Sequence, residues 1–120
     1  MVGDLLHKPY DTTLMKGENT RLSCTTALKE TVDWMFKPFS STNQEKSRYI
    51  VQGGRVVHYL QSRISVLDDT DGRFDLLILN TELSDAGTYF CIDEGGMGEK
   101  ASAQLTVIGE SIFYNFWVTE

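Results

Sequence analysis

The segment Asp85-Ala86-Gly87-Thr88-Tyr89-Phe90-Cys91 decides the fold of this chain. It ends on a cysteine, with a tyrosine two positions earlier. Further upstream, Cys24 is followed ten positions later by Trp34. Two cysteines that flank a tryptophan in this way are typical of a β-sandwich whose two sheets share one core.

Around this segment, short runs alternate between apolar and polar residues and are separated by turn residues, which favours a sandwich or a barrel. Pro38 lacks a backbone N–H and is expected to end regular strand pairing. The predicted strands lie at residues 12–15, 21–25, 31–36, 48–51, 56–59, 63–67, 74–78, 88–93 and 101–108.

Length and charge restrict the class of protein. A chain of 120 residues with 41% hydrophobic residues is expected to form one domain. The formal net charge of −6 argues against binding of nucleic acid or anionic lipid, because both need a basic surface. No apolar run reaches the roughly 20 residues of a membrane span, so no direct membrane insertion is expected. The first residues also lack the parts of a signal peptide, and any anchor is expected outside this sequence.

The chain resembles a V-set immunoglobulin domain over about residues 11–108. The matching residues are Cys24, Trp34, Arg63, Leu76, Asp85, Gly87, Tyr89 and Cys91. The resemblance implies an all-β immunoglobulin V-type β-sandwich of two antiparallel sheets, with about nine strands and one disulfide between the sheets. Two predicted strands lie between Trp34 and Arg63, where the variable type adds two.

The resemblance also implies where the cysteines go. In an intracellular protein they would usually be inert thiols, but in this family Cys24 and Cys91 would form the disulfide, with Trp34 packed on it. A structural disulfide implies an oxidising compartment, so the protein is expected to be extracellular or at the cell surface.

Two polar contacts follow from the same resemblance. Tyr89 is expected to form the tyrosine corner, in which its hydroxyl bonds to the backbone just upstream. Arg63 and Asp85 resemble the family's ion pair between the start of one strand and the turn before another. These residues are expected to serve the fold rather than binding.

Rearranged antigen receptors carry an aromatic-Gly-x-Gly bulge, and this chain departs from that pattern. Gly96-Met97-Gly98 has the right glycines, but no aromatic residue precedes it and the run 105–107 follows four residues too late. Residues 95–98 are therefore interpreted as a hairpin tip. The chain is therefore closer to a germline-encoded V domain, which could belong to an innate immune-type receptor, an adhesion protein or an early relative of antigen receptors.

Strand alternation predicts the binding surface, since neighbours of inward residues point outward. In the family's lettering this is the face of strands G, F, C and C′ (the GFCC′ face), which in V-set proteins forms homodimers and heterodimers. The predicted interface residues are Met35, Lys37, Tyr49, Phe90, Ile92 and Met97. An apolar exposed face usually marks an interaction site, so the expected function is a non-catalytic recognition module with a protein partner, favouring a homodimer.

Three other readings stay open. A long loop or the chain's own tail could cover the apolar face. The loop end of the sandwich could bind a basic ligand through Asp93, Glu94 and Glu99. The domain could also be a structural spacer in a multi-domain surface protein.

The end of the sequence differs from the rest. Residues 1–109 are predicted to be the V-set domain, and residues 110–120 an apolar, aromatic tail. The tail is too short to cross a membrane. It could open a second domain, form a stem or take part in a dimer contact.

Catalysis, metal binding and cofactors are not expected. The two histidines, His7 and His58, fall on segments unlikely to meet, and the cysteines are assigned to the disulfide. The sequence has no nucleophile elbow, phosphate loop or zinc-protease motif. The acidic run 68–71 lacks the spaced ligands of a calcium loop.

Overall fold

A computed structural model describes residues 5–26, 32–39, 47–57, 62–68, 72–93 and 100–109. The predicted hairpin tip at 95–98 and the tail at 110–120 lie outside the described residues. Within them, no helix has the length and apolar character that a membrane crossing requires.

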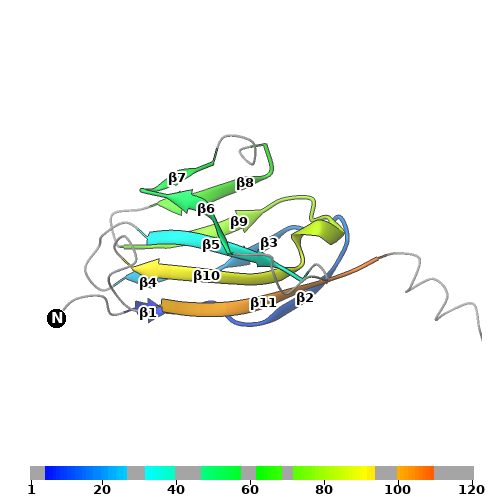
Figure 1. Ribbon diagram of the computed structural model, residues 1–120, viewed down its shortest axis with the longest axis horizontal. Coiled ribbons are helices and arrows are strands. Elements are labelled where there is room, and N and C mark those ends of the chain that lie inside the picture. The colour runs from blue at the N-terminus through cyan, green and yellow to red at the C-terminus, as the bar shows by residue number, and fades with distance from the viewer. Residues whose placement is uncertain are drawn as a thin grey trace, which may run out of the picture.

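One layer of the sandwich is a six-stranded sheet (Figure 1). Its antiparallel centre pairs β11 with β10, β10 with β5, and β5 with β6. At one edge β2 runs parallel to β11, and at the other edge β7 pairs with β6. In spatial order the strands are β2 (Thr12–Met15), β11 (Lys100–Ile108), β10 (Gly87–Asp93), β5 (Val32–Pro38), β6 (Arg48–Gln52) and β7 (Arg55–Val56).

The second layer is a three-stranded sheet in which β9 lies between β3 and β8. A short pair, β1 with β4, joins it through an isolated bridge between Thr25 and Arg73. A 3-10 turn, η2 (Leu83–Asp85), leads into β10. The strands of this layer are β3 (Thr20–Leu22), β9 (Phe74–Ile78), β8 (Ile64–Asp68), β1 (Leu5–His7) and β4 (Thr25–Thr26).

The predicted V-type sandwich is confirmed, with three differences of detail. The described residues form eleven strands rather than about nine, because β1 was not predicted and the second predicted strand is divided into β3 and β4. At that division the Cys24 N–H donates to the side-chain Oδ1 of Asp75 on β9 (2.9 Å) instead of to a backbone carbonyl of that strand. The pairing of β2 with β11 is parallel, whereas purely antiparallel sheets were expected.

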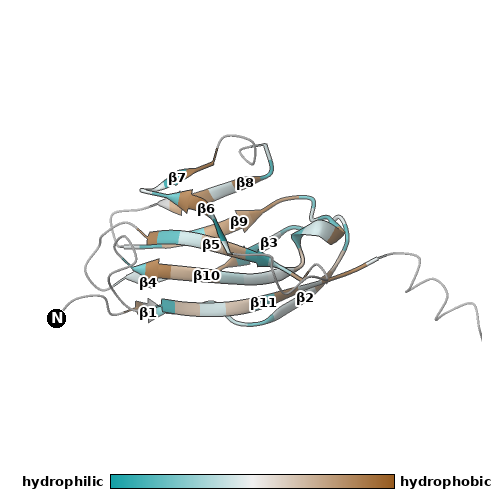
Figure 2. Ribbon diagram, in the orientation of Figure 1, coloured by the Kyte–Doolittle hydropathy of each residue, from teal (hydrophilic) through white to brown (hydrophobic). Residues whose placement is uncertain are grey.

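Alternating side chains from both sheets fill the core. Along β11, Ala103 and Leu105 are buried, whereas the adjacent Ser102 and Gln104 are exposed. The β11 ribbon accordingly changes between brown and paler or teal bands in Figure 2. The fully buried side chains of largest volume include Trp34, Tyr89, Leu22, Ile50, Leu76, Ile78 and Leu105.

The predicted disulfide is present between Cys24 and Cys91 and connects the two layers. Trp34 packs in the same buried cluster, and its indole N–H donates to the Phe74 carbonyl across the sandwich (2.9 Å). This bond satisfies the one polar atom of the Trp34 side chain, which is fully removed from solvent.

The turn before β10 contains the two polar contacts that the resemblance implied. The Tyr89 hydroxyl donates to the Asp85 carbonyl (2.6 Å), and Arg63 binds both oxygens of the Asp85 carboxylate (2.8 and 3.1 Å). The hydrogen bond to Asp85 holds the pKa of Arg63 above its ordinary value. Burial, together with the nearby Asp85 charge, raises the pKa of Tyr89 well above its ordinary value.

Candidate interaction face

A row of apolar side chains crosses the outer face of the six-stranded sheet. The register places Phe90 of β10 opposite Met35 of β5, and Met35 opposite Tyr49 of β6. Directly opposed residues point to the same face of a sheet. Since Trp34 and Cys91, the chain neighbours of Met35 and Phe90, point into the core, the row points away from it. The structure therefore brings together three of the predicted interface residues, all half-buried.

Two lysines flank this apolar row. Lys37 is exposed and pairs in register with Thr88, two positions from Phe90. On the other side, the Nζ atom of Lys100 lies 4.7 Å from the centroid of the Phe90 ring, within the range of a cation–π contact. Lys37 was predicted for this face. Lys100 was not, although the alternation of polar residues along β11 would have placed it there.

The prediction that Ile92 is available on this face is wrong, because only 6% of Ile92 is exposed. Alternation does direct Ile92 outward, but its two cross-strand partners, Lys100 and Asp33, crowd it. Lys100 extends towards Phe90, and Asp33 is itself buried and accepts a hydrogen bond from the Gly53 N–H (2.9 Å). The turn between β6 and β7 therefore lies against this part of the face.

One of the three acidic residues predicted for the loop-end site is not available for binding. Asp93 was predicted to be exposed, but it is fully buried at the end of β10, and its Oδ2 accepts a hydrogen bond from the Thr26 hydroxyl (3.1 Å). β10 continues two residues beyond Cys91, so alternation directs Asp93 inward. The other predicted residues, Glu94 and Glu99 at the loop end and Met97 at the interface margin, lie outside the described residues.

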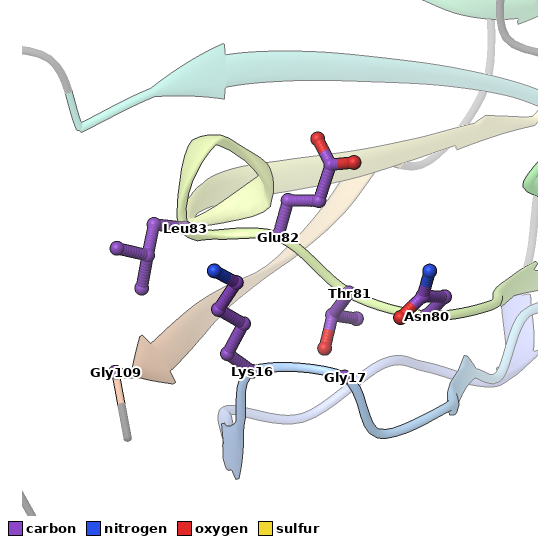
Figure 3. A pocket seen from close by; sticks show the side chains of 7 residues that line it. All are labelled: Lys16, Gly17, Asn80, Thr81, Glu82, Leu83 and Gly109. Carbon is purple, nitrogen blue, oxygen red and sulfur yellow. The ribbon is translucent and has the colours of Figure 1, made fainter. Parts of the chain in front are cut away.

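A hollow of about 470 Å³ lies at the opposite end of the sandwich, where the chain leaves β11 (Figure 3). Lys16 extends towards the turn that carries Glu82 and Leu83, and the Leu83 side chain is exposed beside Gly109. The lining residues are Lys16, Gly17, Asn80, Thr81, Glu82, Leu83 and Gly109. In the described part of the chain, no group of three or more His, Cys, Asp or Glu side chains could hold a metal ion.

Sequence comparison identifies the family of this fold. The model of the immunoglobulin V-set domain matches residues 7–108, which is most of the chain. The chain belongs to the immunoglobulin V-set family. The match starts in β1 and ends with β11, so both sheets of the V-set sandwich fall within it. No curated protein matches the sequence of this V-set domain.

Solved structures with the same fold are distant in sequence. The V-set domain is similar to a crystal structure of Dpr11 IG1 bound to DIP-gamma IG+IG2 (TM-score 0.68, 22% identity), with 88% of this chain and 50% of that one covered. The RIG-5 IG1 homodimer gives a TM-score of 0.65 at 17% identity, covering 86% of this chain and 94% of that one. The first Ig domain of the mouse polymeric immunoglobulin receptor gives 0.68 at 14% identity, covering 89% and 96%.

These identities support a shared fold and no more. The V-set domain spans about half the length of the first two structures that it matches, whose chains are covered to 50% and 48%.

Proposed function

We propose that this V-set domain is a non-catalytic protein-recognition module that pairs with a second copy through the outer face of β11, β10, β5 and β6. The observation that carries the proposal is the row Phe90–Met35–Tyr49, which the strand register aligns on that face. Aromatic residues and methionine are enriched in the cores of protein interfaces. The lysines on either side of the row would form the polar rim.

Self-pairing is favoured by the symmetry of such a row. A two-fold axis through Met35 would place the Phe90 end of one row against the Tyr49 end of the other, so that the same surface serves both copies. In this arrangement Lys100 and Lys37 lie away from the axis, where charged groups keep their water. The RIG-5 IG1 homodimer is a structure of the same fold that pairs with itself, and Dpr11 with DIP-gamma is one that pairs with another protein.

The alternatives have less support. The buried position of Asp93 removes one of the three acidic residues on which a loop-end site depended, and no observation favours a purely structural spacer. We further propose that residues 1–109 are the recognition domain, extracellular or at the cell surface. For residues 110–120, the start of a second domain is favoured over a stem or a dimer contact.

Sedimentation velocity tests the proposal. Wild type is expected to shift from monomer to dimer as its concentration rises. Phe90→Glu is expected to weaken the dimer by about 1,000-fold, since both copies carry the change and each central aromatic contributes about 2 kcal/mol. Leu79→Glu is the matched control, because Leu79 is 46% exposed and comes directly after β9 in the other layer. Its dimerisation should equal that of wild type.

Two results would contradict self-pairing. One is a wild type that stays monomeric at every concentration. The other is a dimer that Leu79→Glu weakens as much as Phe90→Glu does, because the contact would then lie elsewhere. Circular dichroism of both variants checks that the sandwich is retained.

A further inference from the structure

Exposed apolar side chains lie at the end of the sandwich where the chain leaves β11, beside the hollow of about 470 Å³ (Figure 3). Leu83 of η2 is 53% exposed there, and its Cδ2 atom would lie 3.7 Å from a Cβ atom added to Gly109. Phe39, 49% exposed, is attached to the same turn, because its N–H donates to the Ala86 carbonyl (3.3 Å). Two of the four large hydrophobic side chains that are exposed among the described residues therefore lie at this end.

The backbone groups at the floor of this hollow already have partners. The Gly17 N–H donates to the Thr81 carbonyl (2.8 Å), and the Thr81 N–H and hydroxyl both donate to the Glu18 carbonyl (3.0 and 2.8 Å). The Lys16 N–H donates to the Ile108 carbonyl (2.8 Å), which ties the floor to β11. These bonds form the hollow before anything binds, which lowers the cost of docking. An occupant gains little from hydrogen bonds to such a floor and most from apolar contact.

The residues that follow Gly109 in the sequence have the matching apolar character. After Glu110 and Ser111 comes a run with four aromatic side chains and no charge, Ile112-Phe113-Tyr114-Asn115-Phe116-Trp117-Val118. An extended chain spans at most about 3.3–3.6 Å per residue, so residues 112–114 can lie no further than about 11–18 Å from Gly109. Because Gly109 itself lines the hollow, the start of this run is within reach of Leu83.

We propose that residues 112–114 dock on this end of their own domain, with the Leu83 side chain as the central contact. The tether supplies the segment at an effective concentration in the mM range, which a segment from a second copy would have to match from solution. Lys16 is exposed at the margin of the hollow, and Glu110, the first residue after Gly109, carries the opposite charge. A second domain after residue 109 is compatible with this docking, because its first residues would meet this end of the sandwich.

Nuclear Overhauser effects (NOEs) in the 120-residue chain test the docking. The ring protons of Phe113 or Tyr114 are expected to show NOEs to the Leu83 methyl groups. A mixture of ¹³C-labelled and unlabelled chains separates contacts within one chain from contacts between copies. Leu83 methyls without an NOE to either ring, or NOEs between copies only, would overturn the docking. Rings that contact Met35 or Phe90 instead would also overturn it, because the segment would then cover the other face.

Cleavage by chymotrypsin measures the docked population, because slow proteolysis follows the equilibrium fraction of the open form. Cleavage after Tyr114 is expected to be on the order of tenfold faster in Leu83→Ser than in wild type, as the loss of one leucine contact implies. Leu79→Ser is the matched control, because Leu79 is 46% exposed and comes directly after β9 in the other layer. Its cleavage rate should equal that of wild type.

A second variant changes the segment instead of the sandwich. Phe113 comes after β11, so Phe113→Ser keeps the test valid even where Leu83→Ser perturbs the fold. It should also accelerate cleavage after Tyr114. Each rate is divided by that of the synthetic peptide 110–120 with the same sequence, which removes any preference of the protease for the altered residue.

Equal normalised cleavage rates in wild type, Leu83→Ser and Phe113→Ser would overturn the docking. So would a rate for Leu79→Ser that rises as much as the rate for Leu83→Ser. Circular dichroism of the variants checks that the sandwich is retained. None of these results depends on whether the domain pairs with a second copy through its outer face.

Discussion

Removing the Asp85 carboxylate should cost this domain a large part of its stability. The Asp85 side chain is 9% exposed and accepts three hydrogen bonds, two from Arg63 and one from the Glu82 N–H (2.7 Å). Asp85→Ala removes the main partner of the Arg63 guanidinium, which is only 23% exposed. It also removes the acceptor of the Glu82 N–H in the turn. The neighbouring Tyr89 contact uses the Asp85 carbonyl and survives the change.

The magnitude follows from burial. Breaking a buried ion pair by removing one partner costs about 3–5 kcal/mol, and each hydrogen bond to a charged group contributes about 1.5–3 kcal/mol. Arg63 recovers part of this because it keeps some contact with water and lies 3.8 Å from Glu82 Oε1. We therefore expect Asp85→Ala to lower the free energy of unfolding by about 3 kcal/mol, at the lower end of the range.

Urea unfolding followed by tryptophan fluorescence measures this loss, since Trp34 is fully buried. Glu18→Ala is the matched control: its exposed carboxylate accepts one backbone hydrogen bond, from the Met15 N–H, and its loss should cost at most about 1 kcal/mol. Arg63→Ala should cost about as much as Asp85→Ala, and the double variant about 4 kcal/mol rather than 6. Costs that simply add, or an Asp85→Ala variant as stable as Glu18→Ala, would refute the reasoning.

Two further changes probe the same end of the domain. Tyr89 has a pKa raised by burial, so the folded state holds its proton more tightly than the unfolded state, whose tyrosine titrates near pH 10. The free energy of unfolding should therefore not depend on Tyr89 below pH 10 and should fall above it, by about 1.4 kcal/mol at pH 11. In urea unfolding, Tyr89→Phe should not show this decrease. If wild type and Tyr89→Phe lose stability in parallel as the pH rises, the argument is wrong. Gly87→Ala should destabilise by about 3 kcal/mol or more, because an added Cβ would lie against the Lys37 carbonyl and the Phe36 ring. Gly109→Ala, whose Cβ would meet Leu83 at 3.7 Å, should melt within a few degrees of wild type; equal melting temperatures for the two glycine variants would contradict the packing argument.

The sequence predicted the direction of those side chains whose chain neighbours are buried in the core. Cys24, Trp34 and Cys91 fix which residues point inward, and alternation then determines the direction of Met35 and Phe90. The alignment of Tyr49 with Met35 needed the structure, because a register shift lies between Trp34 and Met35. Spacing along one strand says nothing about register between strands.

The burial of Ile92 and Asp93 could not be predicted from the pattern of a single strand. Alternation gives the direction of a side chain but not what covers it, and Ile92 is covered from both adjacent strands. Asp93 ends the predicted strand 88–93 and was also assigned to the loop-end site, but its carboxylate is buried and accepts a hydrogen bond from the Thr26 hydroxyl. In both cases the deciding contact comes from a residue distant in the sequence.

A hollow of about 280 Å³ on the outer face of the smaller sheet was missed for the same reason; it is lined by His7, Arg21, Ser23, Thr25, Arg73 and Asp75. His7, Arg21 and Arg73 are far apart in the sequence, and only the pairing of β1 with β4 and the bridge from Thr25 to Arg73 bring them together. Their charges also disappear in the acidic total of the chain. The net charge of a chain indicates whether a broad basic surface can exist. It does not show where a few basic side chains gather next to a carboxylate.

The disulfide connects the two layers beneath their outer faces. Cys91 is the chain neighbour of Phe90 on the proposed pairing face, and Cys24 is the chain neighbour of Ser23 on the outer face of the other layer. Each outward residue is held by a cysteine that points inward, so the bond fixes two faces on opposite sides of the sandwich at once.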